Sequence, residues 1–257
     1  MISRIYGAYF AFALTVLWLT LNILKLATAP FDRNLHLLHK WTGLVAFKGT
    51  FMEHLWGCRF AHAERLDPRA SYIFVANHQS LADILVLFGL NRNFRWVAKD
   101  YVFRIPVLGS VLLLNEYVCL PKTLGGVRKA MQSCKHLLRC GISLFIFPEG
   151  TRSVSGEIQE FYDGAFKLSI ETGIPIVPIV IDGTRSVLPK GSLLFRFGGK
   201  VRVQVMPPVH PALCDYDVHS LKTYVRSKMQ HELQRMRGAQ PIGSMIYANS
   251  AVSRIAS

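Results

Sequence analysis

The feature that most constrains the fold of this chain is an alternation of short apolar runs with segments of helical periodicity. Short apolar runs bounded by turn residues are typical of buried strands. Strands that alternate with helices favour an α/β fold, here with a mixed sheet flanked by helices. We predict strands at residues 72–76, 94–98, 117–120, 143–147 and 176–181, and helices between them at 81–88, 111–114, 125–138 and 164–170.

Two details of the last part of the sheet are also predicted. The strand at 176–181 contains Pro178, which has no N–H to donate, so we expect this strand at an edge or at a bulge. Residues 193–197 and 201–205 are both largely apolar, and Gly198-Gly199 lies between them. That arrangement predicts a β-hairpin with the two glycines in its turn.

The first 57 residues contain the most apolar stretch of the chain. Residues 8–29 are long enough to span a bilayer, and because Pro30 follows them directly we expect a retained anchor rather than a cleaved signal. A second segment, 35–56, either pairs with the first as a membrane-associated two-helix hairpin or is an ordinary helix of the body. The predicted domains are therefore a membrane-anchoring hairpin at 1–57, an α/β domain at 58–240 and a flexible tail at 241–257.

The net charge of the chain limits the classes of molecule that it is expected to bind. A formal net charge of +14 attracts polyanions, namely nucleic acid, an anionic membrane surface or phosphorylated substrates. No recognisable nucleic-acid-binding motif accompanies the charge, which weighs against the first of these. Few positive charges precede the first apolar stretch and many follow it, so we expect the body in the cytoplasm. A basic helix near residues 221–237 is either a solvated face or a membrane-surface element.

The segment Asn77-His78-Gln79-Ser80-Leu81-Ala82-Asp83 lies at the turn between a predicted strand and the next helix. The carboxylate of Asp83, one helical turn beyond His78, is close enough to bond to the imidazole. A carboxylate on one ring nitrogen fixes the tautomer and makes the other nitrogen a better base, suited to activating a hydroxyl. The alternative is structural, with Asn77 and Ser80 as helix caps and Asp83 as a first-turn charge.

A second polar cluster, Pro148-Glu149-Gly150-Thr151-Arg152-Ser153, follows the predicted strand at 143–147. Ligands of open α/β sheets bind at the carboxyl ends of strands, and a guanidinium there is suited to bidentate capture of a phosphate. We expect Glu149 to orient Arg152 or to accept a hydrogen bond from a substrate hydroxyl. The alternative for this cluster alone is a β-turn with a local Glu–Arg pair. Both clusters can face one cleft.

Together these motifs resemble the glycerolipid acyltransferase family, and within it the bacterial 1-acylglycerol-3-phosphate acyltransferases. The resemblance rests on His78, four residues and Asp83, followed by residues 147–153 and by the apolar run 176–180 around its internal proline. It implies substrate contacts at Glu149, Gly150, Thr151 and Arg152.

One block of the chain departs from the family pattern. The family usually has an Asp-Arg pair after a Gly-rich strand, whereas this chain has Pro121-Lys122 there. Lys122 is the expected substitute, but an ammonium lacks the planar fork of a guanidinium, which leaves the acceptor head group open. Lys99 resembles a basic residue that the family places near the substrate phosphate.

The resemblance implies acyl transfer from a thioester, acyl-CoA or acyl carrier protein, to the hydroxyl of 1-acylglycerol 3-phosphate, giving phosphatidic acid. His78 would be the general base and Asp83 its orienting partner, with backbone N–H groups near Gly150 as candidates for stabilising the oxyanion. No metal or cofactor is required, and the protein would sit on the cytoplasmic side of the inner membrane. Other acceptors, such as a lyso-ornithine lipid, glycerol 3-phosphate or another lysophospholipid, stay open, as does a non-catalytic membrane-surface protein.

Overall fold

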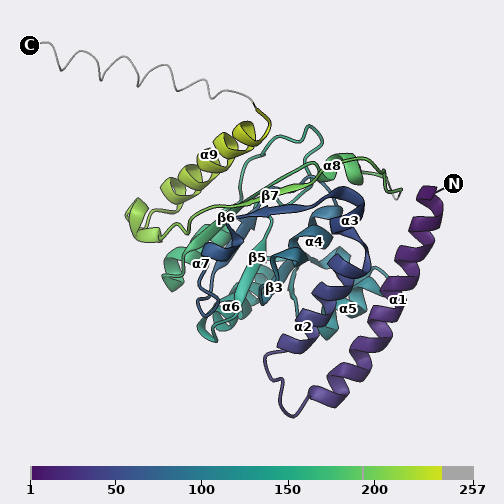
Figure 1. The fold of residues 1–257 in the computed structure, drawn as a ribbon. Helices are drawn as coiled ribbons and strands as arrows, with labels where there is room; N and C mark the ends of the chain where they lie inside the picture. Colours follow the sequence, from purple (N-terminus) through teal and green to yellow (C-terminus); the bar gives the residue numbers. More distant parts are fainter. Residues whose placement is uncertain (1, 193, 239–257) are drawn as a thin grey trace, which may run out of the picture.

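The computed structural model describes residues 2–192 and 194–238. Their seven-stranded sheet has the order β1-β7-β6-β2-β5-β3-β4 (Figure 1). Neighbouring strands are parallel except for β6 and β7, which are antiparallel, so the predicted mixed α/β sheet is confirmed. The strands are β1 Arg59–Ala61, β2 Ile73–Ala76, β3 Phe94–Lys99, β4 Val118–Leu120, β5 Ser143–Ile146, β6 Ile176–Asp182 and β7 Arg202–Val205.

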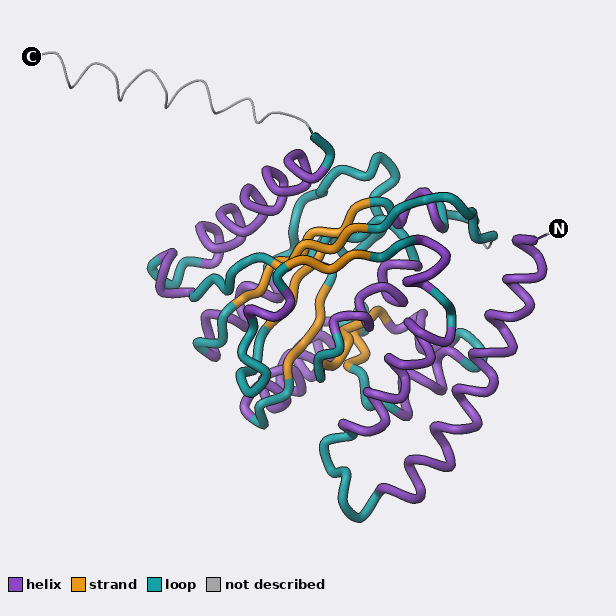
Figure 2. Tube along the Cα trace, viewed as in Figure 1, coloured by secondary structure: helices purple, strands orange, loops and turns teal. Residues whose placement is uncertain are grey.

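Helices cover both faces of the sheet, which forms the middle layer (Figure 2). On one face α6, α7 and α9 pack over an apolar cluster that includes Ile73, Val75 and Leu144. On the other face α3, α4 and α5 pack over Phe74, Phe145 and their neighbours. The α-helices are α1 Ile2–Thr28, α2 His36–Gly43, α3 Met52–Trp56, α4 Ala82–Leu87, α5 Leu108–Leu114, α6 Leu124–Arg139, α7 Gly164–Thr172, α8 Thr184–Val187 and α9 Val218–Met236. The shorter or wider helical turns are η1 Leu44–Gly49, η2 Ala63–Arg65, η3 Phe88–Leu90, η4 Asp100–Arg104 and η5 Pro211–Cys214.

The predicted late hairpin is wrong. Residues 194–199 form no strand, and β7 instead pairs with β6 on one side and with β1 on the other. Both edges of β7 are therefore taken, which leaves no position for a hairpin partner. The apolar side chains that suggested the strand pack elsewhere: the ring of Phe197 stacks on Trp56 with centroids 5.5 Å apart, and Phe195 contacts both Trp56 and Tyr6.

The strand that contains Pro178 lies inside the sheet, between β7 and β2, so the edge placement is wrong. The bulge, however, is present. Ile176 pairs with Val209 and Ile179 with Val205, so the partner chain has one extra residue between these two points. Pro178 lies within this shifted segment and has no N–H to pair. Its carbonyl accepts a hydrogen bond from the N–H of Met206 at 2.9 Å. A missing donor is tolerated there because the ladder is already interrupted.

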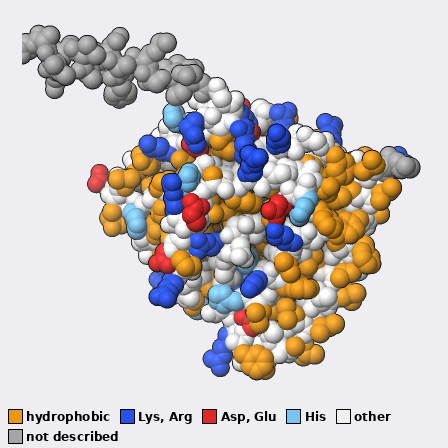
Figure 3. All heavy atoms as spheres, viewed as in Figure 1, with side chains coloured by type: hydrophobic (Ala, Val, Ile, Leu, Met, Phe, Trp, Pro, Cys, Tyr) orange, Lys and Arg blue, Asp and Glu red, His pale blue; other side chains and the backbone are white. Residues whose placement is uncertain are grey.

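The N-terminal helix α1 is the one helix of the described chain that is long and apolar enough to cross a membrane. It packs beside α2, as the two-helix hairpin prediction expects, through an apolar cluster that includes Leu17, Leu21 and Leu38. Many of its outward side chains are apolar and exposed, and in Figure 3 apolar atoms gather along its side of the molecule. This face suggests membrane association.

Residues 35–56 do not form one continuous helix. The segment passes from α2 through the wide turns of η1 and breaks at Phe51, which has a φ of 56°, before α3 begins. Trp56 and Met52 are fully buried in the core of the body, and the Tyr6 hydroxyl of α1 donates to the carbonyl of Thr50 at 2.6 Å. The N-terminal segment therefore shares one core with the α/β body. A separate anchoring domain at 1–57 stays a prediction.

The predicted basic helix is α9, and several of its cations are tied to the body. Lys222 pairs with Asp163, Arg226 with Glu160, and the following Arg237 with Glu157. These partners explain part of the basic face without a membrane. The tail predicted at 241–257 lies outside the described residues.

Candidate active site

The parallel sheet brings the two predicted motifs to the same edge. His78 follows β2 and Glu149 follows β5, and these strands are neighbours although 70 residues separate them in sequence. The carboxyl ends of adjacent parallel strands meet at one edge, where open α/β sheets bind ligands. The motifs are in direct contact: the N–H of Ser153 donates to the carbonyl of His78 at 2.7 Å, and a Glu149 oxygen accepts the N–H of His78 at 2.9 Å.

The imidazole of His78 and the carboxylate of Asp83 form a hydrogen bond of 2.8 Å between Nδ1 and Oδ2. The same Oδ2 accepts the N–H groups of Gln79 at 2.7 Å and Ser80 at 2.9 Å, and Asp83 is fully buried. Because a carboxylate accepts, Nδ1 carries the proton and Nε2 keeps its lone pair. The His78 side chain is 13% exposed, so Nε2 is the nitrogen available to a substrate hydroxyl.

An aromatic side chain fixes the plane of this imidazole. The Phe147 ring stacks on His78 with centroids 3.9 Å apart and planes 15° apart, and Trp96 stacks on the other side of Phe147 at 5.5 Å. Sequence reasoning placed Phe147 only at the end of a strand and missed this role. No local pattern marks the contact, since it joins neighbouring strands.

The loop that carries His78 is anchored by side chains that were expected to be helix caps. The Asn77 amide donates to the carbonyl of Ile181 at 2.9 Å and accepts its N–H at 2.8 Å, bridging to the end of β6. The Ser80 hydroxyl donates to the carbonyl of Leu188 at 2.6 Å. Asn77 therefore caps no helix, whereas the Ser80 hydroxyl also accepts the N–H of Ala82 at 3.0 Å and Asp83 lies in the first turn of α4, so the structural alternative holds for these two residues.

Glu149 does not act as predicted. Glu149 is 3% exposed, and its carboxylate pairs with no arginine among the described residues. One oxygen accepts the N–H of His78, and the other accepts the N–H of Gln159 at 3.2 Å. Burial raises the pKa of this carboxyl to about 7, although both N–H bonds act in the opposite direction. The side chain thus faces the backbone of His78, and neither Arg152 nor an incoming hydroxyl.

Gly150 occupies the left-handed region with a φ of 64°, and a Cβ there would lie 2.8 Å from the ring of Tyr162. Its own N–H donates to the carbonyl of Phe147 at 3.1 Å, so this particular group is not available to an oxyanion. Within the described residues, the next two N–H groups, of Thr151 and Arg152, have no acceptor. These are the donors that the loop leaves for a ligand.

The cations predicted at the site, Lys99, Arg152 and Lys122, lie on different elements of the fold. Lys99 ends β3, and its Nζ lies 3.8 Å from the position that a Cβ of Gly150 would take. Arg152 is partly exposed, and no hydrogen bond or ion pair engages its guanidinium within the described chain. Lys122 follows the outermost strand β4, three strand spacings or roughly 14 Å from β2. The structure brings Lys99 and the Arg152 loop together; Lys99 pairs with Leu120 of β4, and the role of Lys122, two residues further on, stays a prediction.

One further cation was missed by sequence reasoning. The ammonium group of Lys190, in the crossover between α8 and β7, donates to the carbonyl of Arg152 at 2.7 Å. Its neighbours Pro189 and Gly191 indicate a turn, but nothing local places that turn over the second motif. Lys190 therefore adds positive charge beside Arg152.

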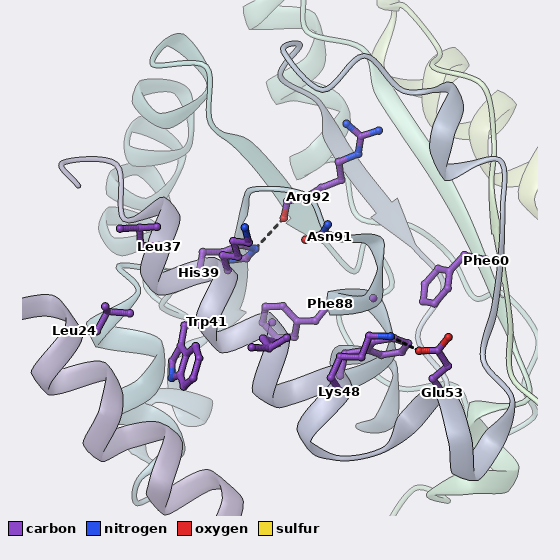
Figure 4. A pocket seen from close by; sticks show the side chains of 15 residues that line it. Leu24, Leu37, His39, Trp41, Lys48, Glu53, Phe60, Phe88, Asn91 and Arg92 are labelled. Atoms are coloured by element: carbon purple, nitrogen blue, oxygen red, sulfur yellow. Dashed lines mark hydrogen bonds and ion pairs between the residues drawn. The ribbon is translucent and has the colours of Figure 1, made fainter. Parts of the chain in front are cut away.

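An apolar cavity of about 680 Å³ is not part of this site. It lies between α1, α2 and the segment that follows α4, with Leu24, Trp41, Phe60 and Phe88 around it (Figure 4). The α4 helix leads away from the His78 edge of the sheet, and none of the predicted site residues lines the cavity. The site is instead the edge formed by His78 and the 149–153 loop.

Comparisons with known proteins agree with this geometry. The sequence model of the acyltransferase family matches residues 57–182. A chloroplastic 1-acyl-sn-glycerol-3-phosphate acyltransferase of Arabidopsis thaliana is 34% identical over 158 residues, 61% of this chain and 44% of that protein. One from Borreliella burgdorferi is 25% identical over 178 residues, 68% of this chain and 71% of that protein.

The solved structures give a similar result. The crystal structure of the 1-acyl-sn-glycerophosphate acyltransferase PlsC from Thermotoga maritima superposes with a TM-score of 0.76 and 25% identity. The match covers 93% of this chain and 98% of that one. Against the chloroplastic relatives from Arabidopsis thaliana and Brassica napus, the matched region spans less than half of the relative's length, 44% and 42%.

Proposed function

We propose that this chain, whose residues 57–182 match the sequence model of the acyltransferase family, acylates 1-acylglycerol 3-phosphate. The acyl group comes from a thioester and the product is phosphatidic acid. The observation that carries the proposal is the His78–Asp83 pair, whose free Nε2 opens beside the loop of Arg152. A base and an unpaired guanidinium at one edge suit a substrate with both a hydroxyl and a phosphate.

His78 takes the proton of the acceptor hydroxyl through Nε2 as that oxygen attacks the thioester carbonyl. Asp83 holds the ring in the productive tautomer and stabilises the imidazolium that forms. When the tetrahedral intermediate collapses, the C–S bond breaks and the proton passes from His78 to the departing thiolate. The unpaired N–H groups of Thr151 and Arg152 support stabilisation of the oxyanion. No acyl-enzyme is needed, and no metal or cofactor enters the reaction.

The acceptor phosphate is held by Arg152, with Lys99 and Lys190 as further cations beside the loop. Lys122, which follows the strand next to that of Lys99, is the remaining candidate for contact with the phosphate. If the acceptor were a lyso-ornithine lipid, which has no phosphate, the Arg152→Ala variant would retain its rate. Acceptor competition between that lipid, glycerol 3-phosphate and other lysophospholipids tests this point.

The exposed apolar side of α1 supports attachment to the cytoplasmic face of the inner membrane, where the lipid acceptor is found. The net charge of +14 suits an anionic membrane and an acidic donor, either acyl-CoA or acyl carrier protein. The soluble donor and the membrane-bound acceptor would then meet at the His78 edge.

The test is acyl transfer by the detergent-purified protein from a long-chain acyl-CoA to lysophosphatidic acid. The His78→Ala variant should lose a factor of about 10² to 10⁴, the usual contribution of a general base. His136→Ala is the matched control, because His136 is exposed on α6, and it should keep the parent rate. If the parent forms no phosphatidic acid with acyl-CoA or with acyl carrier protein as donor, the proposal is wrong and a membrane-surface binding role is favoured.

A further inference from the structure

Glu149 is a buried carboxylate for which the mechanism above has no use. It is 3% exposed, and its two oxygens accept the backbone N–H groups of His78 at 2.9 Å and of Gln159 at 3.2 Å. We propose that ionised Glu149 is a positioning residue that holds the backbone of His78 in place, and that protonation of Glu149 releases this hold and slows the reaction. This inference rests on the proposed function for its kinetic part.

The geometry requires the ionised form. Each oxygen of Glu149 faces an N–H donor, so both must accept. A protonated carboxyl, or a glutamine amide, would direct a donor against one of the two N–H groups and lose that bond. A buried hydrogen bond to a charged acceptor contributes more free energy than one to a neutral acceptor. Loss of the Glu149 charge therefore weakens the bond that holds the His78 backbone.

His78 is held from both sides of its peptide by the same loop. Its N–H bonds to the side chain of Glu149, and its carbonyl accepts the N–H of Ser153 at 2.7 Å. Because Asp83 and Phe147 already fix the His78 side chain, only a movement of its backbone can still displace the base. A displacement of a fraction of an ångström at a base lowers kcat, whereas substrate affinity depends on the cations of the loop.

The surroundings set the range in which Glu149 titrates. Burial raises its pKa to about 7, and the nearby Asp83 carboxylate acts in the same direction, while the two N–H bonds lower it. Other charged or titratable groups face this region from the packed elements. They are the His78 ring after β2, Lys99 on β3, Tyr162 and Glu160 in the loop before α7, and Arg226 on α9, whose Nε donates to the carbonyl of Gln159 at 2.9 Å.

The experiment compares the parent with Glu149→Gln, Glu149→Asp and the control Glu157→Gln. Glu157 lies in the same loop but is exposed and pairs with Arg237 at 2.6 Å. We expect kcat of Glu149→Gln to fall about 10- to 100-fold with KM for lysophosphatidic acid nearly unchanged. Glu149→Asp, which keeps two acceptors, should recover part of kcat, and Glu157→Gln should match the parent.

The pH profile separates positioning from packing. In the parent, protonation of Glu149 should lower kcat by about the same 10- to 100-fold as Glu149→Gln, which adds a fall of about one to two log units to the acid side of the profile. In Glu149→Gln this additional fall should be absent. A Glu149→Gln variant that keeps the parent kcat and the additional fall would overturn the proposal. If that variant does not fold by circular dichroism, a Glu149→Asp profile with the additional fall and reduced kcat supports it, and a parent-like kcat overturns it.

A second readout does not depend on activity. Histidine-selective isotope labelling allows the ring signals of His78, assigned by their loss in His78→Ala, to be titrated by NMR. In the parent these signals should show two inflections, and in Glu149→Gln only one. A single inflection in the parent contradicts the coupling even if acyl transfer is observed. Two inflections without acyl transfer would support the coupling and reject the proposed acceptor.

Discussion

Replacing Asp83 by asparagine tests how this site fixes its histidine. Oδ2 accepts three N–H groups, from His78, Gln79 and Ser80, at 2.7 to 2.9 Å. The other oxygen, Oδ1, has no partner within the described residues. In Asp83→Asn the amide oxygen should take the place of Oδ2, because an NH₂ group there would face two backbone donors. The His78 tautomer is then preserved, and only the charge is removed.

The expected loss follows from that charge. An imidazolium and a carboxylate about 4 Å apart interact by roughly 4 kcal/mol at an effective dielectric constant of about 20. A neutral hydrogen bond retains about 1 kcal/mol of this. The remaining 3 kcal/mol corresponds to a fall in kcat of about 100-fold. If the amide were reversed and the wrong tautomer formed, the loss would approach the roughly 10⁴-fold seen in the serine-protease triad.

The assay is kcat at saturating lysophosphatidic acid and acyl-CoA, measured for Asp83→Asn, Asp83→Ala and His78→Ala. Asp83→Ala removes orientation as well as charge and should be at least 10-fold slower than Asp83→Asn. The amide NH₂ would occupy the unpartnered Oδ1 position, so we expect a stability cost of about 1–3 kcal/mol, checked by thermal unfolding. A folded Asp83→Asn protein as slow as His78→Ala would refute this account of the loop, and one as fast as the parent would show that the charge is not needed.

Three further results are expected. Burial raises the pKa of Glu149 to about 7, so the folded protein binds this proton more tightly than the unfolded chain does. The stability that results is fully present below the unfolded pKa of 4.5. About 3 kcal/mol of it is lost as the pH rises through 7. Thermal unfolding at about pH 5 and pH 8 should therefore show a larger drop for the parent than for Glu149→Gln. Gly150→Ala should lower both stability, by about 1–3 kcal/mol, and acyl transfer, because of its positive φ and the Tyr162 ring, whereas Gly125→Ala, with open space around it, should not. Asn77→Ala should cost about 1–3 kcal/mol in denaturant unfolding, since the buried N–H of Ile181 loses its acceptor while the Ile181 carbonyl keeps only the Gln79 amide as donor; an unchanged midpoint would exclude that bridge.

Much of the site was visible in the sequence because its parts are local. His78 and Asp83 are five residues apart, and one strand-to-helix turn is enough to bring them within 2.8 Å. The strands at 72–76 and 143–147 were found from runs of apolar residues, which reflect burial on both faces of a parallel sheet. The family resemblance rests on these same local motifs.

The errors concern contacts between distant segments. Glu149 was expected either to orient Arg152, its near neighbour, or to accept a hydrogen bond from a substrate hydroxyl, but the structure gives it the N–H of His78, 71 residues away. The segment before β7 was assigned a hairpin partner, whereas β7 pairs with β1 and β6.

The sequence by itself therefore determined the α/β class, most of the strands and helices and the contact between His78 and Asp83, since burial patterns and short-range geometry depend on neighbouring side chains. Only the tertiary structure decided which strand lies beside which, that Glu149 and Phe147 hold His78, and that Lys190 meets the Arg152 loop. The physical reason is that backbone N–H and C=O groups are the same at nearly every residue. Packing across the whole sheet determines their hydrogen-bond partners, so a local sequence pattern does not predict them.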